Sequence, residues 1–189
     1  MGTDDKAKDF WVFGYGSVIW APDFRFEERT RARLKNYKRW FAQASGDHRG
    51  TPENPGIVVT LLDAPGDDCW GVAYRVSPDH VAPTLARLDY REKQGYRRQK
   101  VPLEIEVGDQ THTLAEATTF LAPADNTHFR GELPAVEVAT IAAAASGPSG
   151  SNEDYVRFLA RALRELDIVD THVMEVEREL DLLRRNEGA

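Results

Sequence analysis

The chain has 189 residues, of which 41% are hydrophobic, 10% aromatic and 29% charged. This length predicts one domain with its own core, and the composition excludes an intrinsically disordered chain. Thirty-one acidic against 24 basic residues give a net charge of −7, which argues against nucleic-acid binding, and a single cysteine excludes disulfide frameworks and cysteine-rich metal sites.

The first nine residues are polar and are expected to form a disordered tail before a single domain over residues 10–189. They lack the hydrophobic segment of a secretory signal, and no stretch approaches the roughly 20 apolar residues of a membrane span. We therefore expect a cytoplasmic protein with no membrane partner.

Several segments have the composition of short β-strands. Residues 10–13 form an aromatic run, and residues 57–62 and 70–76 are predicted to pair as a hairpin across the turn residues 63–68. Buried strand packing is the simplest role for Cys69 beside Trp70. Apolar residues alternate over residues 101–107, and a turn at residues 108–109 leads to an antiparallel partner over residues 111–121.

Helices are predicted in two places. Ser77 and Pro78 are typical of a helix start, and Gly95 is expected to end that helix. Its apolar stripe is Val81, Leu85 and Leu88. A glycine- and serine-rich loop over residues 146–151 precedes a helical C-terminal tail, with helical spacing over residues 155–166 and again over residues 173–183.

Many short strands with few helices between them argue against a doubly wound parallel sheet. The fold class we predict is α+β: a small mixed, largely antiparallel β-barrel packed by helices, closed or nearly closed, with the helical C-terminal tail.

The segment Gly14, Tyr15, Gly16, Ser17 directly follows the first predicted strand. Ile19 excludes the third glycine of a dinucleotide fingerprint, and Tyr15 with Ile19 excludes a serine-hydrolase elbow. Two interpretations stay open: a plain tight turn, or a loop whose backbone amides face a ligand oxygen.

A second loop, over residues 47–52, offers Asp47, His48 and Arg49. No third metal ligand stands at a familiar spacing from Asp47 and His48, so we expect no metal. Arg49 could bind a substrate carboxylate, and a solvated surface loop is an equally good interpretation from the residues alone.

Glu92 continues the apolar stripe of the predicted helix, four residues after Leu88. An acid on a core-facing side is rarely buried unless it is paired or functional. Burial and the C-terminal end of a helix dipole both raise a carboxyl pKa, which suits a general base. The alternatives are a salt bridge with Arg91 or Lys93, or a helix already unwound at this position.

Taken together, these segments resemble the ChaC-type, glutathione-specific γ-glutamylcyclotransferases, in the family's order. The matching segments are residues 13–20, 47–52, 58–61, 70–75, 88–93, 95–96, 125–126 and 147–150. The departures are mild: Val18, Tyr90, Gln94 and residues 44–46 differ from the usual pattern.

The resemblance implies a mixed β-barrel and a cofactor-free conversion of glutathione to 5-oxoproline and cysteinylglycine. It assigns the base role to Glu92. It places γ-glutamyl binding on the loop Val12, Phe13, Gly14, Tyr15, Gly16 and Ser17, and Arg49 is our own further candidate for a substrate carboxylate. We expect a monomer whose partner is a small-molecule substrate. The alternatives are a cyclotransferase acting on other γ-glutamyl amino acids or amines, and a non-catalytic γ-glutamyl-peptide sensor or regulator of ion transport.

Overall fold

The computed structural model describes residues 10–187, so the predicted tail over residues 1–9 lies outside the described part. Its centre is a closed five-stranded barrel with the strand order β1-β3-β2-β4-β5. These strands are β1 (Phe10–Gly14), β2 (Glu28–Ser45), β3 (Gly56–Val76), β4 (Arg97–Val107) and β5 (Gln110–Leu121). All neighbours pair antiparallel except β1 and β5, which pair in parallel and close the barrel. The predicted mixed barrel is confirmed.

The predicted hairpin between residues 57–62 and 70–76 is wrong, because both segments belong to the single strand β3. β3 runs antiparallel to β2 on both sides of the turn residues, with Lys35 opposite Asp68 and Tyr37 opposite Asp63. Residues 64–67 therefore bulge out without reversing the chain. Gly66 takes the positive φ that the bulge needs, and its N–H donates to the side-chain oxygen of Asn36 at 3.1 Å.

The hairpin of β4 and β5 is confirmed, with Val107 opposite Gln110 across the predicted turn. Cys69 is buried in β3, as its strand assignment predicts. The whole of β2 has no counterpart among the predicted elements. Its many charged residues hide a strand in which Ala32 and Leu34 are buried in the first half and burial becomes continuous only toward the C-terminal end.

Helix α1 (Pro78–Arg91) begins where the sequence predicts, with Pro78 in its first turn. Ser77 is its N-cap residue, although its side chain makes no capping hydrogen bond. The helix ends at Arg91, earlier than the predicted stop at Gly95. Along its inner face Leu88 is fully buried, so the predicted stripe does point into the molecule.

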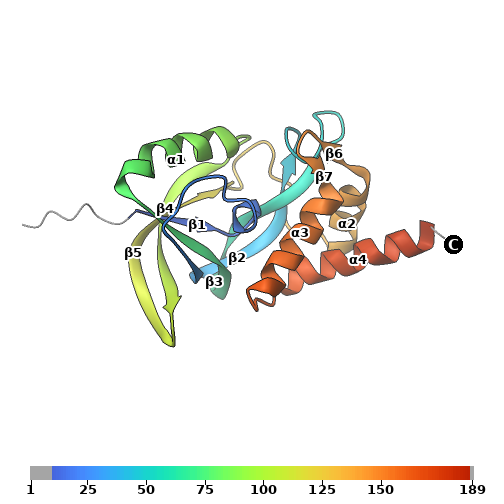
Figure 1. Ribbon diagram of the computed structural model, residues 1–189. Helices are drawn as coiled ribbons and strands as arrows, with labels where there is room; N and C mark the ends of the chain where they lie inside the picture. Colours follow the sequence, from blue (N-terminus) through green and yellow to red (C-terminus); the bar gives the residue numbers. More distant parts are fainter. Residues whose placement is uncertain (1–9, 188–189) are drawn as a thin grey trace, which may run out of the picture.

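Three further helices pack together on one side of the barrel, apart from α1 (Figure 1). They are α2 (Ala135–Ala144), α3 (Asn152–Glu165) and α4 (Thr171–Glu187), of which the last two form the predicted helical tail. Residues 146–151, predicted as a plain loop, contain the two short paired strands β6 (Ser146–Gly147) and β7 (Gly150–Ser151). No helix within residues 10–187 combines the length and apolar character that a bilayer crossing needs.

Candidate active site

A cavity of about 820 Å³ opens between the barrel and α3. This size is typical of a site for a small molecule. Its wall is drawn from the end of β1, the loop after β2, the end of α1, the end of β5 and one residue of α3. Every residue that the sequence analysis proposed for the site lies on this wall: Val12, Phe13, Gly14, Tyr15, Gly16, Ser17, Arg49 and Glu92.

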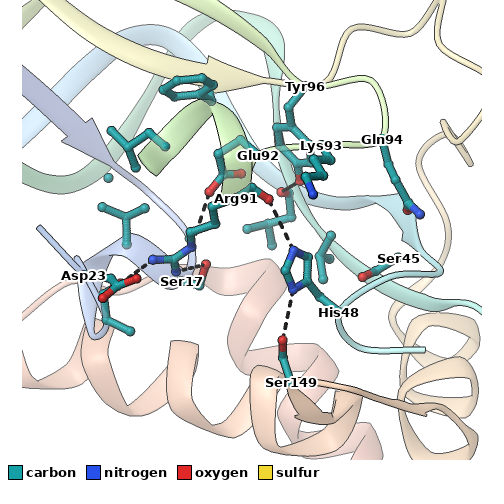
Figure 2. Close-up of a pocket in the computed structure, with 18 of the residues that line it drawn as sticks. Ser17, Asp23, Ser45, His48, Arg91, Glu92, Lys93, Gln94, Tyr96 and Ser149 are labelled. Atoms are coloured by element: carbon teal, nitrogen blue, oxygen red, sulfur yellow. Dashed lines mark hydrogen bonds and ion pairs between the residues drawn. The ribbon is translucent and has the colours of Figure 1, made fainter. Parts of the chain in front are cut away.

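Glu92 is the C-cap residue of α1. Its N–H still donates to the carbonyl of Leu88 at 2.7 Å, but its φ of −88° and ψ of 72° have left the helix. The side chain is only 17% exposed and lines the cavity, where Figure 2 shows it beside Arg91. Helix unwinding at residue 92 thus coexists with a largely buried carboxylate.

Burial raises the pKa of the Glu92 carboxyl above its ordinary value. The Arg91 guanidinium, with its Nε 3.6 Å from Glu92 Oε1, and His48 both pull this pKa down, while Asp47 raises it. The salt bridge to Arg91 therefore exists and does not offset the burial. Lys93 pairs elsewhere, with its Nζ 3.7 Å from the ring centre of Tyr90. A carboxylate with a raised pKa in a cavity is suited to accept a proton near neutral pH.

The segment after β1 turns directly along the cavity wall and enters the 3₁₀ turn η1 (Ser17–Ile19). Its two glycines stand where neighbouring atoms leave little room for a side chain. A Cβ on Gly14 would lie 2.8 Å from Cγ1 of Val18, and one on Gly16 would lie 3.2 Å from the hydroxyl of Tyr155. The amides that begin a helical turn have no partner inside it, so this segment can present N–H groups to a ligand.

Arg39 holds this segment from behind. Its side chain is fully buried; Nε donates to the carbonyl of Tyr15 at 2.6 Å and Nη1 to Oδ2 of Asp170 at 2.5 Å. Nη2 donates to the carbonyl of Trp70. One guanidinium thus ties the cavity loop to β3 and to the junction between α3 and α4. No sequence pattern singles out this residue among the alternating cations of β2.

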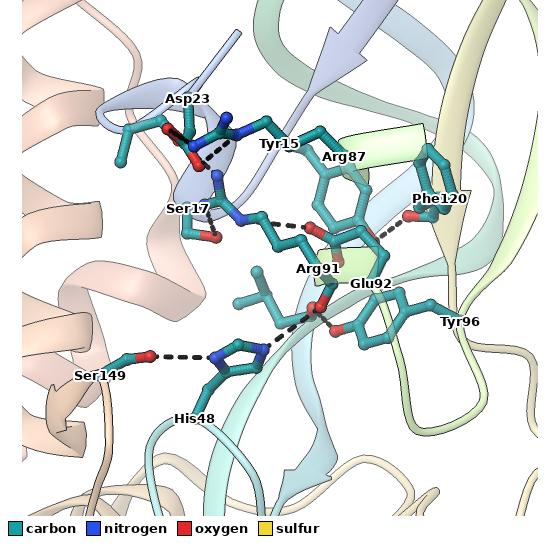
Figure 3. Close-up of polar contacts among 12 residues, drawn as sticks. Tyr15, Ser17, Asp23, His48, Arg87, Arg91, Glu92, Tyr96, Phe120 and Ser149 are labelled. Atoms are coloured by element: carbon teal, nitrogen blue, oxygen red, sulfur yellow. Dashed lines mark hydrogen bonds and ion pairs between the residues drawn. The ribbon is translucent and has the colours of Figure 1, made fainter. Parts of the chain in front are cut away.

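His48 bridges two walls of the cavity. Its Nε2 lies 3.2 Å from the carbonyl of Arg91 and its Nδ1 lies 2.9 Å from Oγ of Ser149 (Figure 3). A carbonyl only accepts, so Nε2 is the donor to Arg91, and the contact between Nδ1 and Oγ of Ser149 completes the bridge. This histidine holds the end of α1. Within residues 10–187, no three His, Cys, Asp or Glu side chains gather as a metal site.

Arg49 borders the cavity, so the loop that carries it is more than a solvated surface loop. Its Nη1 donates to the carbonyl of Ser151 at 3.2 Å, and its guanidinium lies 5.5 Å from the ring centre of Tyr155. Burial lowers the pKa of Arg49, yet an arginine remains charged at neutral pH. A cation of this kind can bind a carboxylate.

Arg91 joins the end of α1 to the loop after β1. It donates from Nη2 to Oγ of Ser17 at 2.8 Å (Figure 3) and from Nη1 to the carbonyl of Ala21 at 2.5 Å. One turn earlier, Arg87 forms a two-bond ion pair with Asp23. The sequence analysis named Arg91 only as a possible salt-bridge partner of Glu92 and did not name Arg87; their i, i+4 spacing on one helix face was the available signal.

The fold and the cavity define a class of small mixed β-barrels that place one buried carboxyl group opposite a glycine-containing loop. The chain belongs to the ChaC-like protein family, which it matches over residues 10–182. This membership agrees with the ordered motifs of the sequence.

Named relatives cover nearly the whole chain. Gamma-glutamylcyclotransferase 2-3 of Arabidopsis thaliana is 36% identical, over 90% of this chain and 87% of its own length. The glutathione-specific gamma-glutamylcyclotransferase of Schizosaccharomyces pombe is 34% identical, over 95% and 96%. Among solved structures, a glutathione-specific gamma-glutamyl cyclotransferase from yeast superposes with a TM-score of 0.85 at 27% identity, over 92% and 96% of the two chains.

Proposed function

We propose that this protein is a glutathione-specific γ-glutamylcyclotransferase, which releases 5-oxoproline and cysteinylglycine. The observation that carries the proposal is the largely buried Glu92 carboxyl group, with its raised pKa, on the wall of a ligand-sized cavity. The names of the relatives support glutathione as the substrate over other γ-glutamyl compounds. A sensor would gain nothing from a buried carboxyl group that costs stability.

The nucleophile belongs to the substrate. The Glu92 carboxylate accepts a proton from the α-ammonium group of the γ-glutamyl residue, and the freed amine attacks the γ-carbonyl carbon to form a five-membered ring. The carbonyl electron pair moves onto oxygen and returns as the bond to the cysteine nitrogen breaks. The Glu92 carboxylic acid then gives its proton to the leaving amine. The regenerated carboxylate takes the second proton of the ring nitrogen, which the lactam must lose, and this proton ends on the amine product as its ammonium group. Because the attack is intramolecular, holding the substrate chain in a folded conformation supplies several kcal/mol of the barrier reduction.

Two other parts of the wall are assigned to substrate binding. The segment from Val12 to Ser17 approaches it closely through its glycines and offers backbone amides to its oxygen atoms. We assign Arg49 the role of binding a substrate carboxylate. It is a cation on the cavity wall, and the Ser151 carbonyl, which accepts from Nη1, does not neutralise its charge. We propose that the protein acts as a monomer in the cytoplasm.

The direct test of this function is incubation of the purified protein with reduced glutathione, followed by mass spectrometry. We expect 5-oxoproline and cysteinylglycine in equal amounts. A parallel panel of γ-glutamyl amino acids and γ-glutamylamines is expected to give far slower turnover. A folded protein that binds glutathione in calorimetry but forms neither product would be a sensor, and equal rates across the panel would remove the specificity for glutathione.

Activity is expected to survive chelation. The proposed reaction uses only proton transfers and the amine of the substrate, and no three His, Cys, Asp or Glu side chains gather as a metal site among the described residues. Product formation should therefore be the same after dialysis against EDTA as before. Loss of turnover that a divalent cation restores would contradict this prediction and would direct attention to Asp47 and His48.

A further inference from the structure

Tyr155 of α3 is buried, with 5% of its surface exposed, and lies on the wall of the cavity. The sequence predicts it only as part of the core face of a helix. Its ring is fixed by an edge-on contact with Trp20, whose ring centre is 5.4 Å away, and by a tilt of 78° against Phe41. The guanidinium of Arg49 covers the ring. The position of the hydroxyl is thus set by packing on several sides.

Three tyrosines of the cavity wall, Tyr15, Tyr96 and Tyr155, differ in the hydrogen bonds of their hydroxyl groups. Tyr15 donates to the carbonyl of Phe120 at 2.6 Å, and Tyr96 donates to the carbonyl of Val59 at 2.7 Å. Tyr155 instead accepts, from the N–H of Val59 at 3.4 Å. Its own proton goes to no acceptor among residues 10–187, so this hydroxyl remains free to donate.

The Tyr155 hydroxyl lies next to the segment from Val12 to Ser17, which is proposed to bind the substrate. A Cβ added to Gly16 would come within 3.2 Å of the Tyr155 hydroxyl oxygen, which puts this hydroxyl beside the backbone of the loop. Burial raises the pKa of Tyr155 to about 12, with the negative charge of Glu92 adding to the rise. The hydroxyl therefore keeps its proton throughout the pH range in which Glu92 loses its own.

We propose that Tyr155 is a catalytic residue that donates its hydroxyl hydrogen bond to the γ-carbonyl oxygen of the substrate, most strongly when that oxygen carries the negative charge of the tetrahedral intermediate. This inference rests on the proposed function. As the amine–carbon bond forms, the π electron pair moves onto the oxygen beside the Tyr155 hydroxyl. When the pair returns, the bond to the cysteine nitrogen breaks. Tyr155 keeps its proton throughout, while Glu92 carries the protons that move from the α-nitrogen to the leaving amine.

A neutral donor fits this oxygen better than a cation does. The γ-carbonyl is uncharged in the bound substrate and charged only in the intermediate, so a buried hydroxyl stabilises the intermediate more than the ground state. The permanently charged carboxylates of the substrate are better matched to Arg49. The two side chains stack on one another, so both can contact one substrate at different oxygen atoms.

The test is Tyr155→Phe, which keeps the ring and its packing and removes only the hydroxyl. Loss of one donor to an oxyanion costs on the order of 10²–10³ in rate. We expect kcat for glutathione to fall about 100-fold, with KM changed less than threefold. The matched control is Tyr96→Phe, since each substitution leaves one backbone group of Val59 without its tyrosine partner. We expect the control to keep kcat within about threefold of the wild type.

Melting temperatures and glutathione affinity by calorimetry accompany the kinetics. A kcat of Tyr155→Phe within threefold of the wild type would overturn the proposal, and so would equal losses in the two variants. A rise in KM at constant kcat would also overturn it, since it would assign the hydroxyl to ground-state binding. The wild-type reaction is the reference: absence of 5-oxoproline there would refute the proposed function itself.

Discussion

Glu92→Gln is expected to fold, to bind glutathione and to turn it over at least 100-fold more slowly than the wild type. Glutamine retains the size of the side chain but cannot accept the ammonium proton, and a positioned base contributes on the order of 10²–10⁴ in rate. The loss should appear in kcat, with binding changed little, as for a group that acts in the transition state. Turnover within threefold of the wild type would rule out the base role.

Two further measurements separate this role from a structural one. In the wild type, kcat/KM should fall on the acidic side as pH drops through the pKa of Glu92, and this limb should lie above the ordinary glutamate value of 4.5. Because the folded pKa is raised, the stabilising contribution of the protonated carboxyl is complete at low pH and is lost as pH rises through the folded pKa. At neutral pH we therefore expect Glu92→Gln to melt at the same temperature as the wild type or slightly above it. A clearly lower melting temperature with normal turnover would identify a structural carboxylate.

Arg39→Leu is expected to lower the free energy of unfolding by about 3–5 kcal/mol, the cost typical of removing one partner of a buried ion pair. The substitution leaves Asp170 without its cation and two backbone carbonyls, of Tyr15 and Trp70, without their donor. Urea denaturation measures this loss. The released Tyr15 carbonyl should also loosen the substrate loop and raise KM in the molecules that remain folded.

The matched control for Arg39→Leu is Arg75→Leu. Arg75 is also a strand arginine. It forms ion pairs with two carboxylates, Glu27 and Glu28, but these pairs lie at the surface. Exposed pairs contribute little to stability, so the control should lose far less. Similar losses in the two variants would show that the buried position of Arg39 carries no special cost.

The parts of the fold that sequence predicted are those written in local patterns. The alternation over residues 101–107 and the start at Ser77 and Pro78 specify a strand and a helix without reference to the rest of the chain. The turn residues 63–68 misled the prediction because their chemistry is that of a turn, whereas their pairing with β2 is set by distant residues. Helix α2 was not predicted, because its sequence is apolar on nearly all sides and so lacks the apolar stripe that indicates an amphipathic helix.

The site divides in the same way. Glu92 could be found because an acid interrupts an apolar stripe, which is a local contradiction that a reader of sequence can see. Arg39 and Tyr155 could not be found, since a cation on a strand and an aromatic residue on a helix face are both ordinary in sequence. Only the tertiary structure shows that Arg39 is buried and that the Tyr155 hydroxyl accepts a hydrogen bond without donating one within the described part of the chain. His48 was considered in the sequence only as a possible metal ligand. In the structure its ring contacts Ser149 and the carbonyl of Arg91, which are contacts between distant segments that the sequence does not indicate.

The parallel pairing of β1 with β5 has a consequence for the order in which this molecule folds. The first strand of the barrel is closed by the last, which ends more than a hundred residues later in the chain, and the cavity needs Tyr155 from still further on. Such distant pairings carry a large loop-closure entropy and belong to slow-folding topologies. Most of the chain must therefore leave the ribosome before the cavity can form. A nascent chain, or one truncated before α3, is expected to have no activity toward glutathione.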